Sequence, residues 1–141
     1  MSFSRGCVSF RISAENLNPC EITEILGIEP DVSYKKGDPI TSVNSKGEAL
    51  VTSCHEFGFW SIKSEEKENE GVEQHAKGLL MLLESRKREL LGLSNKGHKM
   101  DFSCDFFSDD CHQPGFSINP YIMLKLGQLN IKLSICFLKS N

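Results

Sequence analysis

Three segments of the chain alternate strictly between apolar and polar residues, and this pattern restricts the possible folds more than any other feature. The segments run from Cys7 to Ile12, from Met100 to Phe106 and from Ile131 to Phe137. A period of two is typical of a β-strand with one face in the core and the other in water. Strands of this kind predict a mostly antiparallel sheet that is covered on one face only.

Three further segments have the spacing or the end signals of helices. Asn-Pro pairs at 18–19 and 119–120 place a capping residue before a proline, and Gly27 and Gly127 follow as helix ends. Between them, the segment from Val72 to Leu93 predicts one long amphipathic helix. Its apolar stripe consists of Val72, Ala76, Leu79, Leu80, Leu83 and Leu90.

The remaining segments are shorter or richer in turn-forming residues. Residues 30–50 are expected to form a long loop, with a hairpin about Asn44 to Gly47. A strand is expected from Glu56 to Ser64, and its aromatic residues Phe57, Phe59 and Trp60 are expected in the core rather than stacked on bases. A short strand from Phe116 to Ile118 is expected to form a hairpin with the strand that ends at Phe106.

These elements together predict one α+β domain over residues 1–141. It would have a mostly antiparallel sheet of about five strands, with one long and two short helices on one face. A chain of 141 residues, 39% of them hydrophobic, builds its core without disulfides or a structural metal. The other face of the sheet is expected to be polar and hydrated, with Cys7, Ser9, Arg11, Asp101, Ser103, Asp105, Lys132, Ser134 and Cys136 on it.

Composition limits the cellular compartment and the class of binding partner that we expect. We expect a cytoplasmic protein without contact with a membrane, because the chain has neither a signal-peptide core nor an apolar run of about 18 residues. Its six cysteines are then expected to be reduced. A formal net charge of -3 without a basic stripe argues against nucleic acid as a partner.

The sequence favours neither catalysis nor a cofactor. Phosphate-binding loops, dinucleotide fingerprints, nucleophile-elbow serines and zinc-protease histidines are all absent from it. The closest approach to a metal site is Cys54-His55 together with Cys111-His112. Adjacent residues of an extended chain point to opposite sides, so surface loops are expected there instead, with no metal. Cys104, on an apolar strand face, is expected to be a small buried residue rather than a nucleophile.

Acidic residues are the one charged feature that stands out. They gather at two places, and we take them as candidate partner-binding residues: Glu65, Glu66, Glu68, Glu70, Asp109 and Asp110. Acidic side chains so placed would steer a basic protein toward the chain, at a rate that falls as salt rises. The alternative is that both places are only solvated connections.

A family resemblance spans nearly the whole chain. The run from Glu21 to Pro30, the Lys-Gly-Asp loop at 36–38, the tryptophan strand at 59–61 and the ending from Phe116 onward resemble a bacterial family of unknown function. That family has an ITExLGIxP helix, a KxGD loop and a tryptophan strand. The resemblance implies a compact α+β domain without established catalytic residues. The stretch at 40–55 departs from the family pattern and resembles an insertion.

Small families of this kind occur among the immunity genes beside bacterial toxins. The resemblance therefore implies an immunity protein that binds and neutralises a toxin domain, of the contact-dependent growth inhibition type. The acidic residues named above would favour a basic, nuclease-like toxin as its partner. Two alternatives stay open at this point. One is a metal-binding protein or enzyme that uses the Cys-His pairs, and the other is a ligand-binding module that uses the uncovered sheet face.

Overall fold

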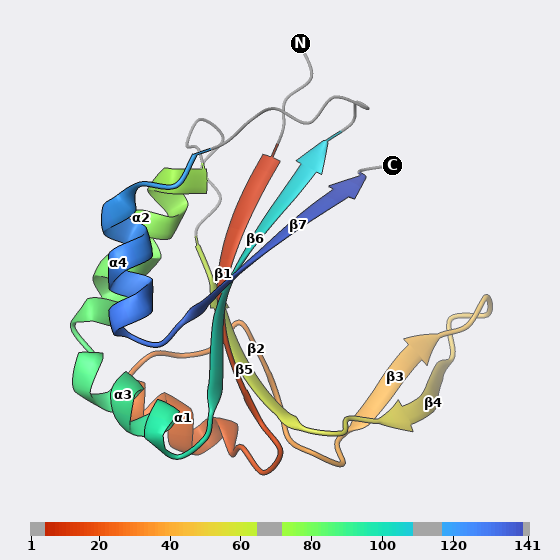
Figure 1. Ribbon diagram of the computed structural model, residues 1–141. Coiled ribbons are helices and arrows are strands. Elements are labelled where there is room, and N and C mark those ends of the chain that lie inside the picture. Colours follow the sequence, from red (N-terminus) through yellow and green to blue (C-terminus); the bar gives the residue numbers. More distant parts are fainter. Residues whose placement is uncertain (1–4, 65–71, 109–116, 140–141) are drawn as a thin grey trace.

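The computed structural model describes residues 5–64, 72–108 and 117–139. Its main feature is a five-stranded sheet in which only one pair of neighbouring strands, β6 (Lys99–Ser108) and β7 (Lys132–Lys139), is parallel. The three inner strands each have a neighbour on both sides. In spatial order the strands are β2 (Val32–Tyr34), β5 (Gly58–Lys63), β1 (Arg5–Ala14), β6 (Lys99–Ser108) and β7 (Lys132–Lys139) (Figure 1).

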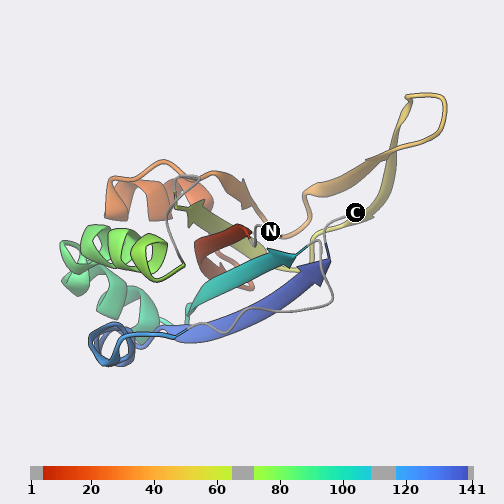
Figure 2. The same ribbon diagram turned by 90° about the horizontal axis from the view of Figure 1, so that it is seen from above.

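Helices cover one face of this sheet and leave the other face open (Figures 1 and 2). In the described part of the chain they are α1 (Pro19–Leu26), α2 (Val72–Glu84), α3 (Lys87–Asn95) and α4 (Pro120–Gln128). The α+β class and the mostly antiparallel sheet are confirmed. None of these helices has both the length and the apolar character needed to cross a membrane.

The core lies between the sheet and the helices, as the alternating pattern predicted. In β1, Val8, Phe10 and Ile12 are fully buried, and Phe102 of β6 packs edge-on against Phe10. Trp60 of β5 is also fully buried, and its indole nitrogen donates to the hydroxyl of Thr23 in α1, 3.1 Å away. The core is therefore continuous from the sheet into the helical layer.

A separate hairpin extends from the sheet on the side opposite the helices (Figures 1 and 2). It consists of β3 (Pro39–Val43) and β4 (Ala49–Cys54), and we call residues 39–54 the arm. At its tip, the side chain of Asn44 accepts hydrogen bonds from the backbone of Lys46 and Glu48, and Gly47 adopts a left-handed φ of 79°. The predicted hairpin about Asn44 to Gly47 is confirmed. The long loop predicted over residues 30–50 is wrong in part, because β2, β3 and the start of β4 lie within it.

The first helix begins and ends where the sequence indicated. The side chain of Asn18 accepts a hydrogen bond from the backbone N–H of Cys20, and Pro19 occupies the first turn, where its missing N–H costs no hydrogen bond. Gly27 ends the helix with a φ of 68°, a conformation that glycine adopts without strain.

The prediction of one helix from Val72 to Leu93 was wrong, because two helices occupy this segment. The break falls at Ser85 and Arg86, where the backbone N–H of Arg86 donates to the carbonyl of Leu83, three residues back. The reason lies in the stripe itself. The positions three and four residues after Leu83 are Arg86 and Lys87, so an unbroken helix would turn charged side chains toward the core. The break lets α3 bring Leu90 and Leu93 into the core instead.

Two predictions near the carboxyl end were also wrong. Ser117 and Ile118 are not in a strand. Both edges of β6 are already occupied, by β1 and by β7, so no edge is open there for a hairpin partner. The last helix also passes through Gly127 and is followed by Asn130, which takes the left-handed conformation with a φ of 58°.

Candidate functional site

The open face of the sheet carries the polar residues that alternation placed there. Backbone register sets them in rows that run across the strands. One row contains Ser61, Arg11, Asp101 and Lys132, and the next contains Lys63, Ser9, Ser103 and Ser134. Cys7, Asp105 and Cys136 form a further row. Strands that are distant in sequence thus bring a set of polar side chains together, and no helix of the described residues lies above them (Figures 1 and 2).

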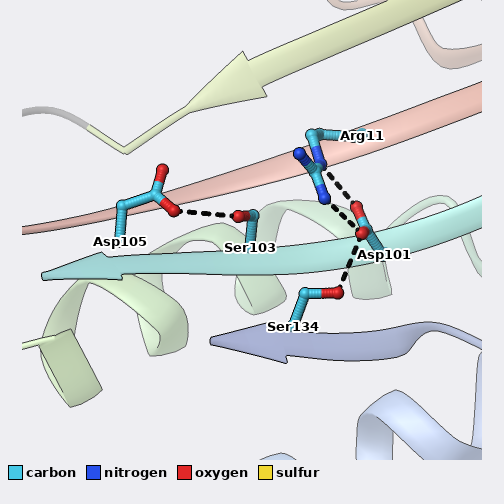
Figure 3. Close-up of polar contacts among 5 residues, drawn as sticks. All are labelled: Arg11, Asp101, Ser103, Asp105 and Ser134. Atoms are coloured by element: carbon cyan, nitrogen blue, oxygen red, sulfur yellow. Dashed lines mark hydrogen bonds and ion pairs between the residues drawn. The ribbon is translucent and has the colours of Figure 1, made fainter. Parts of the chain in front are cut away.

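An ion pair between Arg11 and Asp101 lies at the centre of this face (Figure 3). The guanidinium donates through Nε to one carboxylate oxygen at 2.7 Å and through Nη2 to the other at 2.5 Å. Ser134 donates a further hydrogen bond to this carboxylate at 3.1 Å. The hydrogen bond with Asp101 raises the pKa of Arg11 above its ordinary value, against the opposing effect of burial. Arginine in this setting is a fixed positive charge with a defined orientation.

A second polar contact lies one row along β6. Ser103, which is only 2% exposed, donates its hydroxyl to the carboxylate of Asp105 at 3.1 Å (Figure 3). This hydrogen bond satisfies a buried hydroxyl that would otherwise cost stability.

A shallow cavity of about 300 Å³ adjoins the ion pair on the open face. Two lysines of different strands, Lys99 and Lys132, contribute to its lining, together with Arg11 and Asp101. Its other side is aromatic, because Phe57 and Phe59 also line it. The cavity therefore has a cationic end and an aromatic end.

Aromatic rings continue from this cavity to the base of the arm. Tyr34 of β2 stacks on Phe59 with ring centroids 5.1 Å apart, and on His55 with centroids 3.5 Å apart. Phe57 is 45% exposed, and Phe59 faces the same side of the sheet as Ser13. The prediction that all three aromatic residues of this segment lie in the core is thus wrong for Phe57 and Phe59, and correct for Trp60.

Sequence reasoning missed this aromatic end and Lys99. The alternation of β5 was present, with Trp60 and Ile62 inward and Phe59, Ser61 and Lys63 outward. The aromatic end was missed because Phe59 occupies an outward position of the strand, whereas an aromatic residue in a strand is ordinarily assigned to the core.

The predicted partner-binding residues Glu65, Glu66, Glu68, Glu70, Asp109 and Asp110 lie outside the described residues, as do Cys111 and His112. Cys54 is exposed at the end of β4, and the next residue, His55, stacks on Tyr34. Within residues 5–64, 72–108 and 117–139, no group of three or more histidine, cysteine, aspartate or glutamate side chains is placed to hold a metal ion.

Two other surfaces stand out. The arm is exposed over nearly its whole length, and Val43 and Val51 are 73% and 66% exposed. A larger cavity of about 710 Å³ lies between α2 and α4, with Lys77, Met81 and Glu84 in its lining. Glu84 there accepts a hydrogen bond from the hydroxyl of Tyr121 and pairs with Lys125.

Comparison with known proteins places the chain in a family. The model of the family described as a domain of unknown function (DUF4279) matches residues 3–139. No curated protein and no solved structure matches the chain significantly. Because the family model covers nearly the whole sequence, the chain belongs to the DUF4279 family.

Proposed function

We propose that this member of the DUF4279 family is a non-catalytic protein-binding domain, most concretely an immunity protein of the contact-dependent growth inhibition type. It binds a toxin domain in the bacterial cytoplasm and neutralises it. The observation that carries the proposal is the arm, which extends from the sheet (Figure 2) and has exposed apolar side chains.

The physical argument begins with the isolation of the arm. A two-stranded hairpin is at best marginally stable by itself, and this one has neither a third strand nor a helix against it in the described part of the chain. Register places Val43 opposite Ala49 and Thr41 opposite Val51, so two exposed valines lie on one face of the hairpin. An apolar face on an exposed arm fits a protein surface, which would cover both valines and contact the strands.

The proposed partner is a basic domain, as many nuclease toxins are. The chain has a formal net charge of -3, and between residues 38 and 56 Asp38, Glu48 and Glu56 outnumber Lys46. Glu65, Glu66, Glu68, Glu70, Asp109 and Asp110 add two further acidic segments in the sequence. Complementary charge of this kind increases the rate of association and discriminates against acidic partners.

The test starts from capture and depends on a growth phenotype. Tagged full-length protein is used to capture a partner from the native host, and the captured domain is then expressed alone and with the immunity protein. We expect a domain that stops growth alone and is tolerated in the presence of the wild type. The variant Val43→Ser/Val51→Ser should lose affinity by about tenfold or more and protect poorly.

The matched control is Val32→Ser, which removes a valine that is 52% exposed on β2 rather than on the arm. It should bind and protect like the wild type. Equal protection by the arm variant, or a captured domain without effect on growth, would reject the proposal. Reversal of charge at Glu65, Glu66, Asp109 and Asp110 tests the partner's charge separately, since association should slow and lose its salt dependence. An unchanged association rate would remove the basic partner from the proposal.

A further inference from the structure

The cavity on the open face of the sheet is independent of the arm and has its own chemistry. We propose that it binds a small organic anion in which a flat aromatic ring is joined to a phosphate or carboxylate group. The inference does not rest on the proposed immunity function, because none of the cavity's lining residues belongs to residues 39–54. It rests on the cations at one end, the rings at the other and the space between them.

The cationic end of the cavity has more positive charge than ion pairs with the described residues neutralise. Arg11 is paired with Asp101, but Lys99 and Lys132 form no ion pair with any residue of the described ranges. Register places Lys132 beside Asp101 and Lys99 beside Ser13, so both lysines stand on the open face on adjacent strands. Two ammonium groups at one cavity repel each other, and a bound anion removes that repulsion.

Arg11 supplies a fixed donor at the same end. Its Nε and Nη2 are held by Asp101, which in turn accepts from Ser134, so the guanidinium plane is set before any ligand arrives. In the part of the chain described, its Nη1 donates to no protein acceptor. A planar guanidinium that is already oriented binds phosphate or carboxylate oxygens with less loss of entropy than a free side chain.

The aromatic end fits a ring rather than a second charge. Phe59 is held in place by stacking on Tyr34, and Phe57 leaves 45% of its surface in water beside it. Ser13 lies between Phe59 on β5 and Lys99 on β6 in one row across the sheet, and its small side chain leaves room above the strand. A ligand ring placed over Ser13 would contact Phe59 and direct an attached anion toward the lysines.

The size of the cavity limits the ligand. A volume of about 300 Å³ is at the lower end of the range for small-molecule sites, which is roughly 300–1,000 Å³. It suits a ligand of one or two rings with a single anionic group. A larger ligand would extend into water over the open face.

The experiment separates the two halves of the ligand. Amide chemical shifts of the full-length protein are followed by NMR during titration with phenyl phosphate and with benzoate. Inorganic phosphate and phenol, which each carry one half only, are the controls. We expect saturable shifts centred on Ser13, Phe59, Lys99 and Lys132, and tighter binding of the joined probes than of either half. Tighter binding of phenyl phosphate assigns the anion as phosphate, and tighter binding of benzoate assigns it as carboxylate.

Variants then assign the binding to the cavity. Lys132→Gln should weaken binding of the tighter probe by about tenfold, because it removes a charged partner. Phe59→Leu should weaken it by about threefold or more through loss of ring contact. The matched control is Lys63→Gln, since Lys63 is an exposed lysine of the same sheet face outside the cavity.

Three results would overturn the proposal: inorganic phosphate or phenol binding as tightly as the tighter joined probe, an equal loss in the Lys63→Gln variant, or no saturable shift with either joined probe. Lys132 is exposed and contributes nothing to the core, so Lys132→Gln is expected to fold even if Phe59→Leu does not.

Discussion

At the scale of single residues, the reactivity of a side chain in this protein depends on which face of the sheet the side chain occupies. Cys104 of β6 and Cys136 of β7 are close in the parallel register, yet Cys104 is 1% exposed in the core and Cys136 is exposed on the open face. Desolvation is the main cause that raises the pKa of the Cys104 thiol to about 11, and nearby Asp105 adds to it. Two cysteines on neighbouring strands therefore differ in reactivity, as the alternating pattern predicted for Cys104.

This difference predicts a selective alkylation pattern. At pH 8, iodoacetamide should modify Cys20, Cys54 and Cys136 rapidly and leave Cys104 unmodified, because the thiolate is the reactive form and burial suppresses it. Peptide mass spectrometry after timed quenching measures the rates, and the same reaction in denaturant is the control in which Cys104 reacts like the others. Alkylation of Cys104 at the rate of Cys136 would contradict the predicted burial.

The raised pKa of the Cys104 thiol also makes the free energy of unfolding depend on pH. Its contribution to stability is fully present below pH 9 and is lost as pH rises toward 11.

At the scale of elements, the sequence predicted best where a local signal is sufficient by itself. The amino-terminal cap of α1 depends on Asn18, Pro19 and the backbone next to them, and the hairpin turn depends on four neighbouring residues about Asn44. The break at Ser85 and Arg86 is different. The segment from Val72 to Leu93 has no proline or capping motif in its interior. Only the position of the core determines that its two halves form separate helices.

The local origin of α1 leads to a prediction about its cap. Replacement of Asn18 by alanine should lower the free energy of unfolding by about 1 kcal/mol, since the backbone N–H of Cys20 loses its acceptor. Asn18→Asp keeps a side-chain oxygen at the same place, and its negative charge is favourable at a helix start, so it should stay close to the wild type. Urea denaturation followed by circular dichroism measures both variants. An equal loss in the aspartate variant would show that the cap hydrogen bond is not the cause.

At the scale of the whole molecule, the fold class could be predicted but the candidate site could not be completed. The alternating strands placed Arg11 and Asp101 on one polar face, although 90 residues separate them, and the structure joins them in an ion pair. Which strands lie side by side is a property of the chain as a whole. The places of Phe59 and Tyr34 beside this face therefore could not be predicted from the sequence. The three-residue strand β2 is also too short to show a periodic pattern.

The same topology predicts how stability is distributed over the molecule. β1 and β6 have a neighbour on both edges and the core on one face, whereas the arm has one pair of strands and nearly every residue exposed. Local opening of the arm breaks few contacts, while exposure of β1 and β6 requires global unfolding. Hydrogen exchange measured by NMR should therefore show backbone amides of Phe10 and Phe102 exchanging at least about a thousandfold more slowly than those of the arm. The amides of β5 serve as the internal comparison, because β5 also has two neighbours. Arm amides as slow as those of β1 would mean that the hairpin is stabilised by contacts of its own, and an arm of that kind would need no partner to cover it.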